Sequence, residues 1–356
     1  MIYLVSLAVI VWLLGYANEQ SGLRRNNYKY YAIFAGALVA FVMGMRTRYT
    51  GSSDTQTYII AFNSIKTYEN FGDYYNKYLS ESNFIFSESG FYYFVWLLTR
   101  VTSDGQMLVL VTSAIITFSA CRFIYKNVKD VPTGLLIYVC LGLFTFNMSG
   151  MRQAMAMSVC VLSYEFVKKR KIVWFALSVL LAMQFHKTAI CFAPVYFLPL
   201  LKEGKINNLL YFGAMGIFLF AMDWFIETFN AFTGEEYLVN KEASGGGFTV
   251  VLIYIAAIAL SLVMHESLKK REIRCAFFGV VAGFTTYIAR FFSNQIMERI
   301  SYYFFYFTLL LIPNLIDELD EKERQIVKLL FGILAVLLLW YRVRGGAFRN
   351  FKFHFM

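Results

Sequence analysis

The sequence has little of what a soluble enzyme uses to stay in water and to catalyse reactions. Only 16% of its 356 residues are charged, against about a quarter in a typical soluble domain, and only 3 are histidine. There is no HExxH spacing, no P-loop and no GxSxG motif. The five cysteines lie in or beside apolar segments and form no CxxC pair. We therefore expect no metal site, no disulfide framework and no cofactor.

Apolar residues are abundant and grouped. They make up 58% of the chain, with a mean hydropathy of +0.54. The first group lacks a basic flank and a small-residue cleavage site, so we interpret it as a retained span. Groups of this kind indicate crossings of a bilayer. They lie near 2–16, 30–46, 88–101, 105–121, 132–148, 150–168, 171–185, 188–201, 207–226, 248–265, 273–292, 298–316 and 326–343.

Lysine and arginine then orient the spans, because short cytoplasmic loops are rich in them. The densest clusters can all be cytoplasmic only if the block at 88–101 does not cross. The predicted fold is thus an all-α, polytopic domain over 1–356 with about twelve transmembrane helices, both termini outside, and a re-entrant or interfacial helix near 88–101. This orientation signal explains the net charge of +10 without nucleic acid as a partner. The three clusters are Arg24, Arg25 and Lys29, then Lys168 to Lys171, then Lys269, Lys270, Arg271 and Arg274.

Two stretches are expected to lie outside the helices and on the extracytoplasmic side. The first, 47–87, is polar and forms, with the short helix that follows, an outer segment over 47–104. The second, 227–247, ends in three consecutive glycines. Loops of this length inside a compact domain are usually functional.

Ionisable residues near the outer ends of spans are costly in a bilayer and are therefore candidates for function. Arg152 and Gln153 follow Gly150 where an apolar block begins, so the guanidinium and a helix N-terminus could together bind phosphate. The alternative is a side chain that snorkels to the interface. Arg290 and Arg299 flank one outer turn, and with Arg152 they suit a diphosphate.

Other candidates lie nearby on the same side. Arg46 or Arg48 could complete the arginine cluster. His186, between two short helices, could act as a general base near neutral pH, unless it is only a capping or packed histidine. Asp54 is the other candidate base.

Five short segments follow one another in an order and spacing shared with a family of membrane enzymes. They are Gly44-Met45-Arg46 with Gly51 to Thr55 and Tyr58, Glu88-Ser89-Gly90-Phe91, Met151 to Ala156, Phe185 to Ala189, and Glu298-Arg299-Ile300 with Tyr303. In this arrangement the chain resembles the EpsG-type, Wzy-like polymerases of bacterial surface polysaccharide. One serine more than the family pattern separates Gly51 from Asp54.

The resemblance implies a metal-independent glycosyltransferase of GT-C-like architecture in the bacterial cytoplasmic (inner) membrane. Its substrate would be an undecaprenyl-diphosphate-linked oligosaccharide, transferred en bloc to a new repeat unit on the extracytoplasmic face. Membrane lipid and a chain-length regulator protein are expected partners.

The resemblance also suggests site roles. Arg152, Arg290 and Arg299 would neutralise the leaving diphosphate, and His186 or Asp54 would deprotonate the acceptor. Arg46 or Arg48 would hold the second lipid diphosphate. The remaining substrate-binding residues would be Gln153, Glu88 and Tyr303.

Three other functions remain open. A flippase or exporter of the same lipid-linked glycan would also use buried arginines. A membrane polysaccharide O-acetyltransferase is a further alternative, although the N-terminal helices hold no histidine for the early Arg/His pair of such enzymes. A non-catalytic assembly subunit would tolerate the loss of His186.

Overall fold

The computed structural model describes residues 1–20, 27–50, 53–80, 88–233, 247–292, 296–345 and 348–355. Over these residues the chain is helical, with an isolated bridge between Arg46 and Phe353 and no strand. The helices of the N-terminal half are α1 (Ile2–Gln20), α2 (Asn27–Gly44), α3 (Ser53–Ile65), α4 (Phe71–Tyr78), α5 (Ser89–Val101), α6 (Gln106–Asn127), α7 (Val131–Cys140), α8 (Leu143–Ser149) and α9 (Met151–Lys168). Those that follow are α10 (Ile172–Met183), η1 (Lys187–Leu200), α11 (Lys205–Phe220), α12 (Met222–Thr233), α13 (Phe248–Val263), η2 (His265–Lys269), α14 (Arg271–Ala289), α15 (Ile296–Phe305), α16 (Thr308–Ile316) and α17 (Glu321–Val343).

The chain is a multi-pass helical membrane protein. Five helical segments of the described residues are long and apolar enough to cross a bilayer: α1, α6, α14, the continuous α15–α16 pair and α17. Two bent pairs, α7–α8 (49°) and α11–α12 (70°), raise the number to seven if each is one span. The shorter apolar helices are α2, α10, η1 and α13. Every apolar block expected from the sequence contains a helix.

Helix η1 reaches farther than its 14 residues suggest. It is a 3₁₀ helix with Pro194 and Pro199 inside it. A proline in an α-helix would lack its hydrogen bond and clash with the preceding turn. At about 2.0 Å per residue the 3₁₀ form extends to roughly 28 Å. That is close to the ~30 Å thickness of the hydrocarbon core.

The prediction that 47–87 lies outside the helices was wrong, because this stretch contains α3 and α4. Helix α3 buries Thr55, Phe62 and Ile65, which lie on one face at helical spacing. Polar residues between these buried positions make the helical periodicity of α3 difficult to recognise in the sequence. Helix α5 buries Phe91, Val95 and Thr99 at every fourth position, and its 13 residues are about 20 Å long, short of a full crossing. In the second stretch α12 continues to Thr233, and 234–246 lie outside the described residues.

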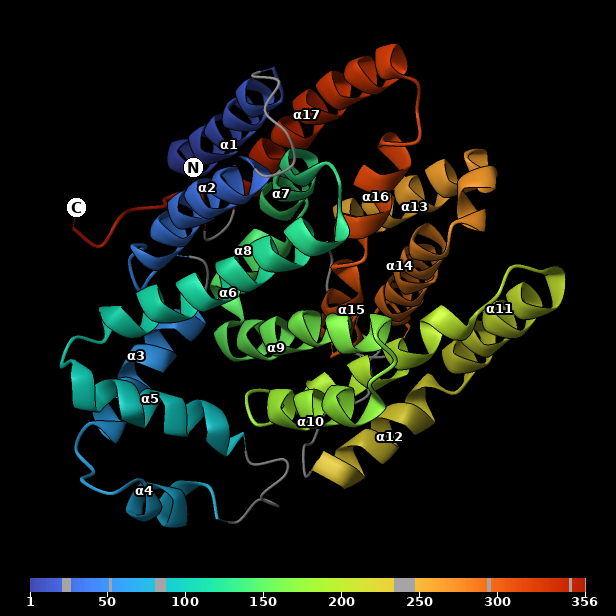
Figure 1. Ribbon diagram of the computed structural model, residues 1–356. Coiled ribbons are helices and arrows are strands. Elements are labelled where there is room, and N and C mark those ends of the chain that lie inside the picture. Colours follow the sequence, from blue (N-terminus) through green and yellow to red (C-terminus); the bar gives the residue numbers. More distant parts are fainter. Residues whose placement is uncertain are drawn as a thin grey trace.

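Figure 1 shows α3, α4 and α5 grouped at one end of the molecule, with α1, α2 and α17 at the other. Helix α2 packs along α6, α9 along α10, and α14 along α15. The amino group of Met1 donates to the carbonyl of Arg349 (3.1 Å), and the amide of His354 donates to the carbonyl of Met45 (2.7 Å). The first residue, the last segment and the α2–α3 connection therefore lie together on one side.

Candidate active site

A cavity of about 230 Å³ lies where the grouped helices α3 and α5 meet the centre of the molecule. The residues around it come from four distant parts of the chain, brought together only by the fold. Five of the residues expected at the site are among them. The lining consists of Asp54, Thr57, Tyr58, Phe146, Ser149, Gly150, Arg152, Gln153, His186 and Arg299.

Helix α9 begins at the cavity. Its N-cap is Gly150, and no side chain of the described residues caps it. The first-turn amides of an α-helix have no partner within the helix and carry a partial positive charge toward its N-terminus. This end of α9, with Arg152 and Gln153 in the first turn, is suited to an anion such as a phosphate.

Glu88 holds the cavity residues in place from behind. Its side chain is only 7% exposed and its backbone is left-handed (φ 53°), a strained conformation for a glutamate that is common at functional sites. One carboxylate oxygen accepts from Arg152 Nη1, and the other accepts from the amide of Lys187 (3.0 Å). The second oxygen also lies 3.4 Å from Nδ1 of His186. A single buried carboxylate thus fixes both Arg152 and His186.

His186 is the N-cap of η1, as the capping alternative predicted, because its Nδ1 lies 3.4 Å from the amide of Thr188. Nδ1 lies 3.0 Å from Oγ1 of Thr188, which in turn lies 3.1 Å from the hydroxyl of Tyr303. Tyr303 is fully buried, so it does not line the cavity and positions His186 through Thr188. The imidazole edge that carries Nε2 is the one turned away from Glu88 and Thr188.

Arg299 reaches the cavity from α15. It is exposed, and its guanidinium makes no hydrogen bond or ion pair within the described part of the chain. Its carbonyl accepts from Nε2 of Gln153 (2.5 Å), which ties α15 to the start of α9. Because Glu88 neutralises Arg152, the positive groups left for a ligand among the described lining residues are Arg299 and the N-terminus of α9.

The other three arginines expected at the site lie elsewhere. Arg46 is completely buried behind the cavity, where Nη2 donates to the carbonyl of Met148 (2.8 Å) and to Oγ1 of Thr55 (3.3 Å). It therefore joins the end of α8 to the start of α3. Arg48 is exposed and lies over the ring of Tyr49, outside the cavity lining.

Arg290 also differs in position from Arg299, although both flank the same turn. Its guanidinium lies 2.6 Å from Glu298 and donates to the hydroxyl of Tyr287 (2.9 Å). The side chain is 6% exposed and is absent from the cavity lining. The arginine cluster expected from the sequence is thus divided between the cavity and a separate ion pair.

Several cavity residues were not expected from the sequence. Thr57 and Tyr58 lie three and four positions after Asp54, so they share its face of α3. Recognising α3 as a helix would have identified both. Burial raises the pKa of Tyr58 and Arg152 opposes that rise, so the phenol keeps its proton and can donate. Tyr92 does not line the cavity, but its hydroxyl lies 3.4 Å from Arg152 Nη1.

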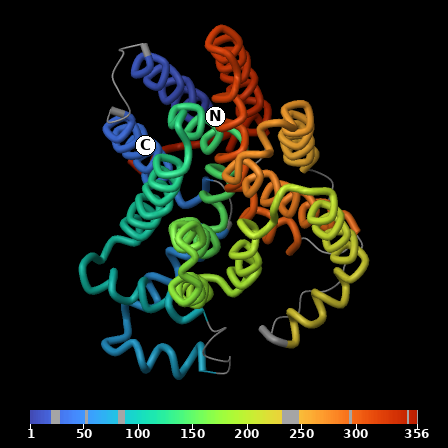
Figure 2. Tube along the Cα trace, turned by 45° about the vertical axis from the view of Figure 1, so that its right-hand side comes forward, coloured from blue at the N-terminus to red at the C-terminus, as the bar shows by residue number. Residues whose placement is uncertain are grey.

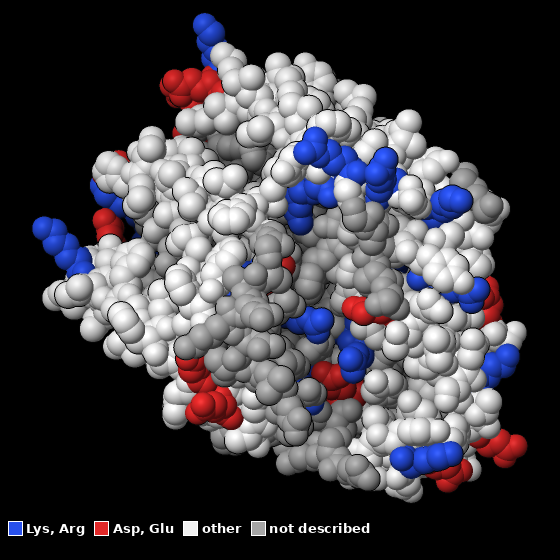
Figure 3. Space-filling view, turned by 180° about the vertical axis from the view of Figure 1, so that it is seen from behind, with Lys and Arg blue, Asp and Glu red and all other residues white. Residues whose placement is uncertain are grey.

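Figure 3 shows basic and acidic side chains gathered around a hollow near the middle of one face of the molecule. Among the described residues no group of three or more histidine, cysteine, aspartate or glutamate side chains has the arrangement of a metal site. The cavity combines an imidazole, a carboxylate, an open guanidinium and a helix N-terminus. These groups can take a proton from a hydroxyl and stabilise a phosphate that departs with negative charge.

Comparison with known proteins identifies a family whose sequence model covers most of the chain. The sequence model of the EpsG family matches residues 29–354, which include every residue of the cavity. No curated protein and no solved structure matches the chain.

Proposed function

The chain belongs to the EpsG family, and we propose that it is a membrane glycosyltransferase that polymerises polysaccharide repeat units carried on undecaprenyl diphosphate. The observation that supports this function is the cavity itself. It places a candidate base, His186, beside the open guanidinium of Arg299 and the N-terminus of α9. A reaction that removes a proton from one group and leaves negative charge on another needs both features.

In the proposed reaction a hydroxyl of the acceptor repeat unit attacks the anomeric carbon of the donor glycan. The new glycosidic bond forms as the bond from that carbon to the diphosphate oxygen breaks. The hydroxyl proton passes to the base, and undecaprenyl diphosphate leaves with the bonding electron pair. The growing glycan is thereby transferred en bloc to the new unit.

We assign the base to His186, because an imidazole has an ordinary pKa close to neutral pH and needs little tuning for this task. In this role the Nδ1 proton would point to the Glu88 carboxylate, 3.4 Å away, and Nε2 would take the proton of the acceptor. Asp54, in the first turn of α3, would bind the acceptor hydroxyls. Arg299 and the α9 N-terminus would stabilise the leaving diphosphate, an electrostatic contribution that is often the largest in such reactions.

We further propose about twelve crossings in a GT-C-like arrangement in the bacterial cytoplasmic membrane, with the cavity on the extracytoplasmic side. The positions of the basic clusters support this orientation. Lys168 to Lys171 follow the far end of α9, whose beginning lies at the cavity, and Arg271 and Arg274 begin α14, whose far end precedes the turn to Arg299. Membrane lipid surrounds the helices, and a chain-length regulator protein is a further proposed partner.

The test is to incubate the purified protein in lipid nanodiscs with a single undecaprenyl-diphosphate-linked repeat unit. A polymerase yields a ladder of products on a gel, and the ladder persists in EDTA because the proposed chemistry uses no metal. A flippase moves the substrate across vesicles without a ladder, and an O-acetyltransferase gives a single acetylated product when an acetyl donor is present. No ladder from folded protein with its own repeat unit would overturn the proposal.

A further inference from the structure

A second hollow, of about 370 Å³, lies beside the cavity between η1, α11, α14 and α15. Figure 2 shows α11 and α12 as a flank alongside η1 and α14. The walls of this groove are apolar throughout, and no charged residue lines it. Its main contacts are Pro194 and Leu198 of η1, Met215 and Phe218 of α11, and Ile300 and Phe304 of α15.

The few polar atoms in the groove are already occupied. The hydroxyl of Tyr211 donates to the carbonyl of Phe278 (2.5 Å), and that of Thr286 donates to the carbonyl of Ala282 (2.9 Å). Since a sugar or a phosphate would be buried there without hydrogen bonds, at a large cost in free energy, the groove suits only hydrocarbon.

At two points of the chain, neighbouring residues line the cavity and the groove. Arg299 lines the cavity and the next residue, Ile300, lines the groove. His186 lines the cavity and immediately precedes η1, which with its C-cap Leu201 forms one wall of the groove from Cys191 onward. At the 3₁₀ rise this wall is about 20 Å long. The same stretches of α15 and η1 thus border both spaces, as a molecule with a charged head in one and a long hydrocarbon tail in the other would require.

We propose that the groove binds the polyprenyl chain of the donor, with the diphosphate at Arg299 and the chain running along η1 toward the middle of the bilayer. This inference rests on the proposed function, because it takes the lipid-linked glycan as the substrate. It identifies η1, α11 and α15 as the surface that recognises the lipid carrier.

The test fills the groove and compares donors of different chain length. Ala214 lines the groove on α11, whereas Ile217, three residues later, is 70% exposed and does not. We compare Ala214→Trp with the matched control Ile217→Trp, using donors with an undecaprenyl chain or a ten-carbon prenyl chain and the same glycan. Thermal unfolding in detergent shows whether each variant is folded.

For Ala214→Trp we expect KM for the long-chain donor to rise at least about tenfold, the contribution of roughly two buried methylene groups. KM for the short-chain donor and kcat for both should change less than twofold. Ile217→Trp should behave as the wild type with both donors. If Ala214→Trp affects the two donors equally, or neither, the groove holds bulk lipid or nothing and the inference is wrong. If the wild type polymerises neither donor, it is the proposed function that fails.

Discussion

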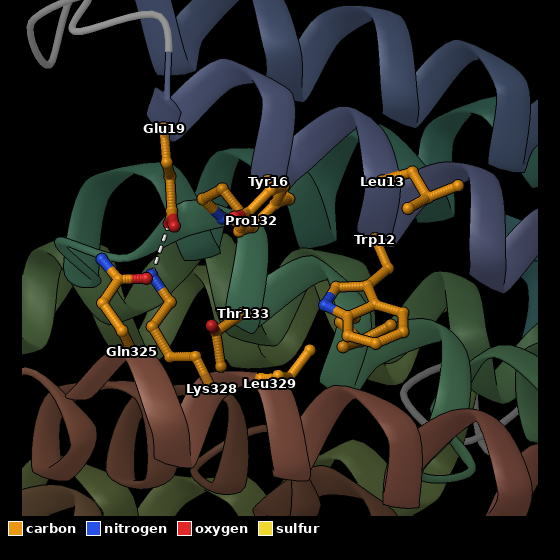
Figure 4. Close-up of a pocket in the computed structure, with 10 residues that line it drawn as sticks. Trp12, Leu13, Tyr16, Glu19, Pro132, Thr133, Gln325, Lys328 and Leu329 are labelled. Carbon is orange, nitrogen blue, oxygen red and sulfur yellow. Dashed lines mark hydrogen bonds and ion pairs between the residues drawn. The ribbon is translucent and has the colours of Figure 1, made fainter. Parts of the chain in front are cut away.

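Two clusters of ionisable side chains lie in different parts of this protein, and only one of them has the features of an active site. The first, which we call the Lys328 cluster, joins α1, α7 and α17 through Glu19, Asp130 and Lys328. Lys328 Nζ lies 2.5 Å from Glu19 and 3.0 Å from Asp130, as Figure 4 shows for the first of these pairs. A cavity of about 320 Å³, larger than the one at His186, lies beside it.

The charged side chains of the Lys328 cluster pair with one another or cap a helix. Asp130 is the N-cap of α7, where it also accepts from the amide and hydroxyl of Thr133 (3.1 and 2.6 Å). Asp317 pairs with Lys129 (2.8 Å) and lies 3.6 Å from Arg324. These contacts fix helices to one another, and the cluster is a structural clamp.

The second cluster, at the His186 cavity, is organised differently. Glu88, Thr188 and Tyr303 lie behind the cavity and hold the residues that face it, while the guanidinium of Arg299 stays open. Neither the number of charges nor the size of the adjoining cavity distinguishes the two regions. The distinction is whether supporting groups orient side chains toward a space, and three variants test it, from the largest expected effect on catalysis to the smallest.

The largest effect is expected from His186→Ala. Loss of a general base typically lowers the rate by about 10²–10⁴-fold, and we expect kcat to fall within that range. The measurement is the initial rate of ladder formation with purified protein. Asp54→Ala is the matched comparison, and its loss should be mainly in KM for the acceptor. A larger fall in kcat for Asp54→Ala than for His186→Ala would exchange the roles of the two residues.

A smaller effect, about 10²–10³-fold in kcat, is expected from Arg299→Ala, because one electrostatic contact to the leaving group is lost. Arg299 is exposed, so the free energy of unfolding should not change. Arg290→Ala is the control, since it leaves the partly buried Glu298 unpaired. It should destabilise the protein by about 1–3 kcal/mol while activity per folded molecule stays near that of the wild type. If Arg290→Ala lowers kcat as much as Arg299→Ala does, Arg290 also contacts the diphosphate and the assignment made here is wrong.

This pair of arginines shows what the sequence could and could not predict. Apolar block length and charge placement predicted a helical membrane protein, and a helix lies in each block. Both arginines were predicted to flank one connection between helices, and they do flank the connection from α14 to α15. Their separation depends on which way each side chain points and on the pairing with Glu298, and neither follows from sequence spacing.

The same reasoning applies to the rest of the site. His186, Arg152 and Asp54 were identified as costly ionisable groups near span ends, and the fold brings them to one cavity. The role of Glu88 could not be predicted, because its contacts with Arg152 and His186 cross 64 and 98 positions of the chain, and only the tertiary structure brings such distant residues together. Arg46 was grouped with the ligand-binding arginines because burial, which places it behind the cavity, is not visible in the sequence.

The smallest effect on catalysis is expected from Lys328→Met, which removes the central cation of the Lys328 cluster. It leaves Glu19 and Asp130 without their cation, with side chains 13% and 6% exposed. Breaking a buried pair in this way typically costs about 3–5 kcal/mol, so the thermal midpoint should fall well below that of the wild type. Activity per folded molecule should stay within twofold, because the clamp is far from the groups that react. Adding Glu19→Gln should recover part of the lost stability by removing one of the two unpaired carboxylates. A fall in kcat that persists in the restabilised double variant would show that the Lys328 cluster is coupled to the cavity and does not act only on stability.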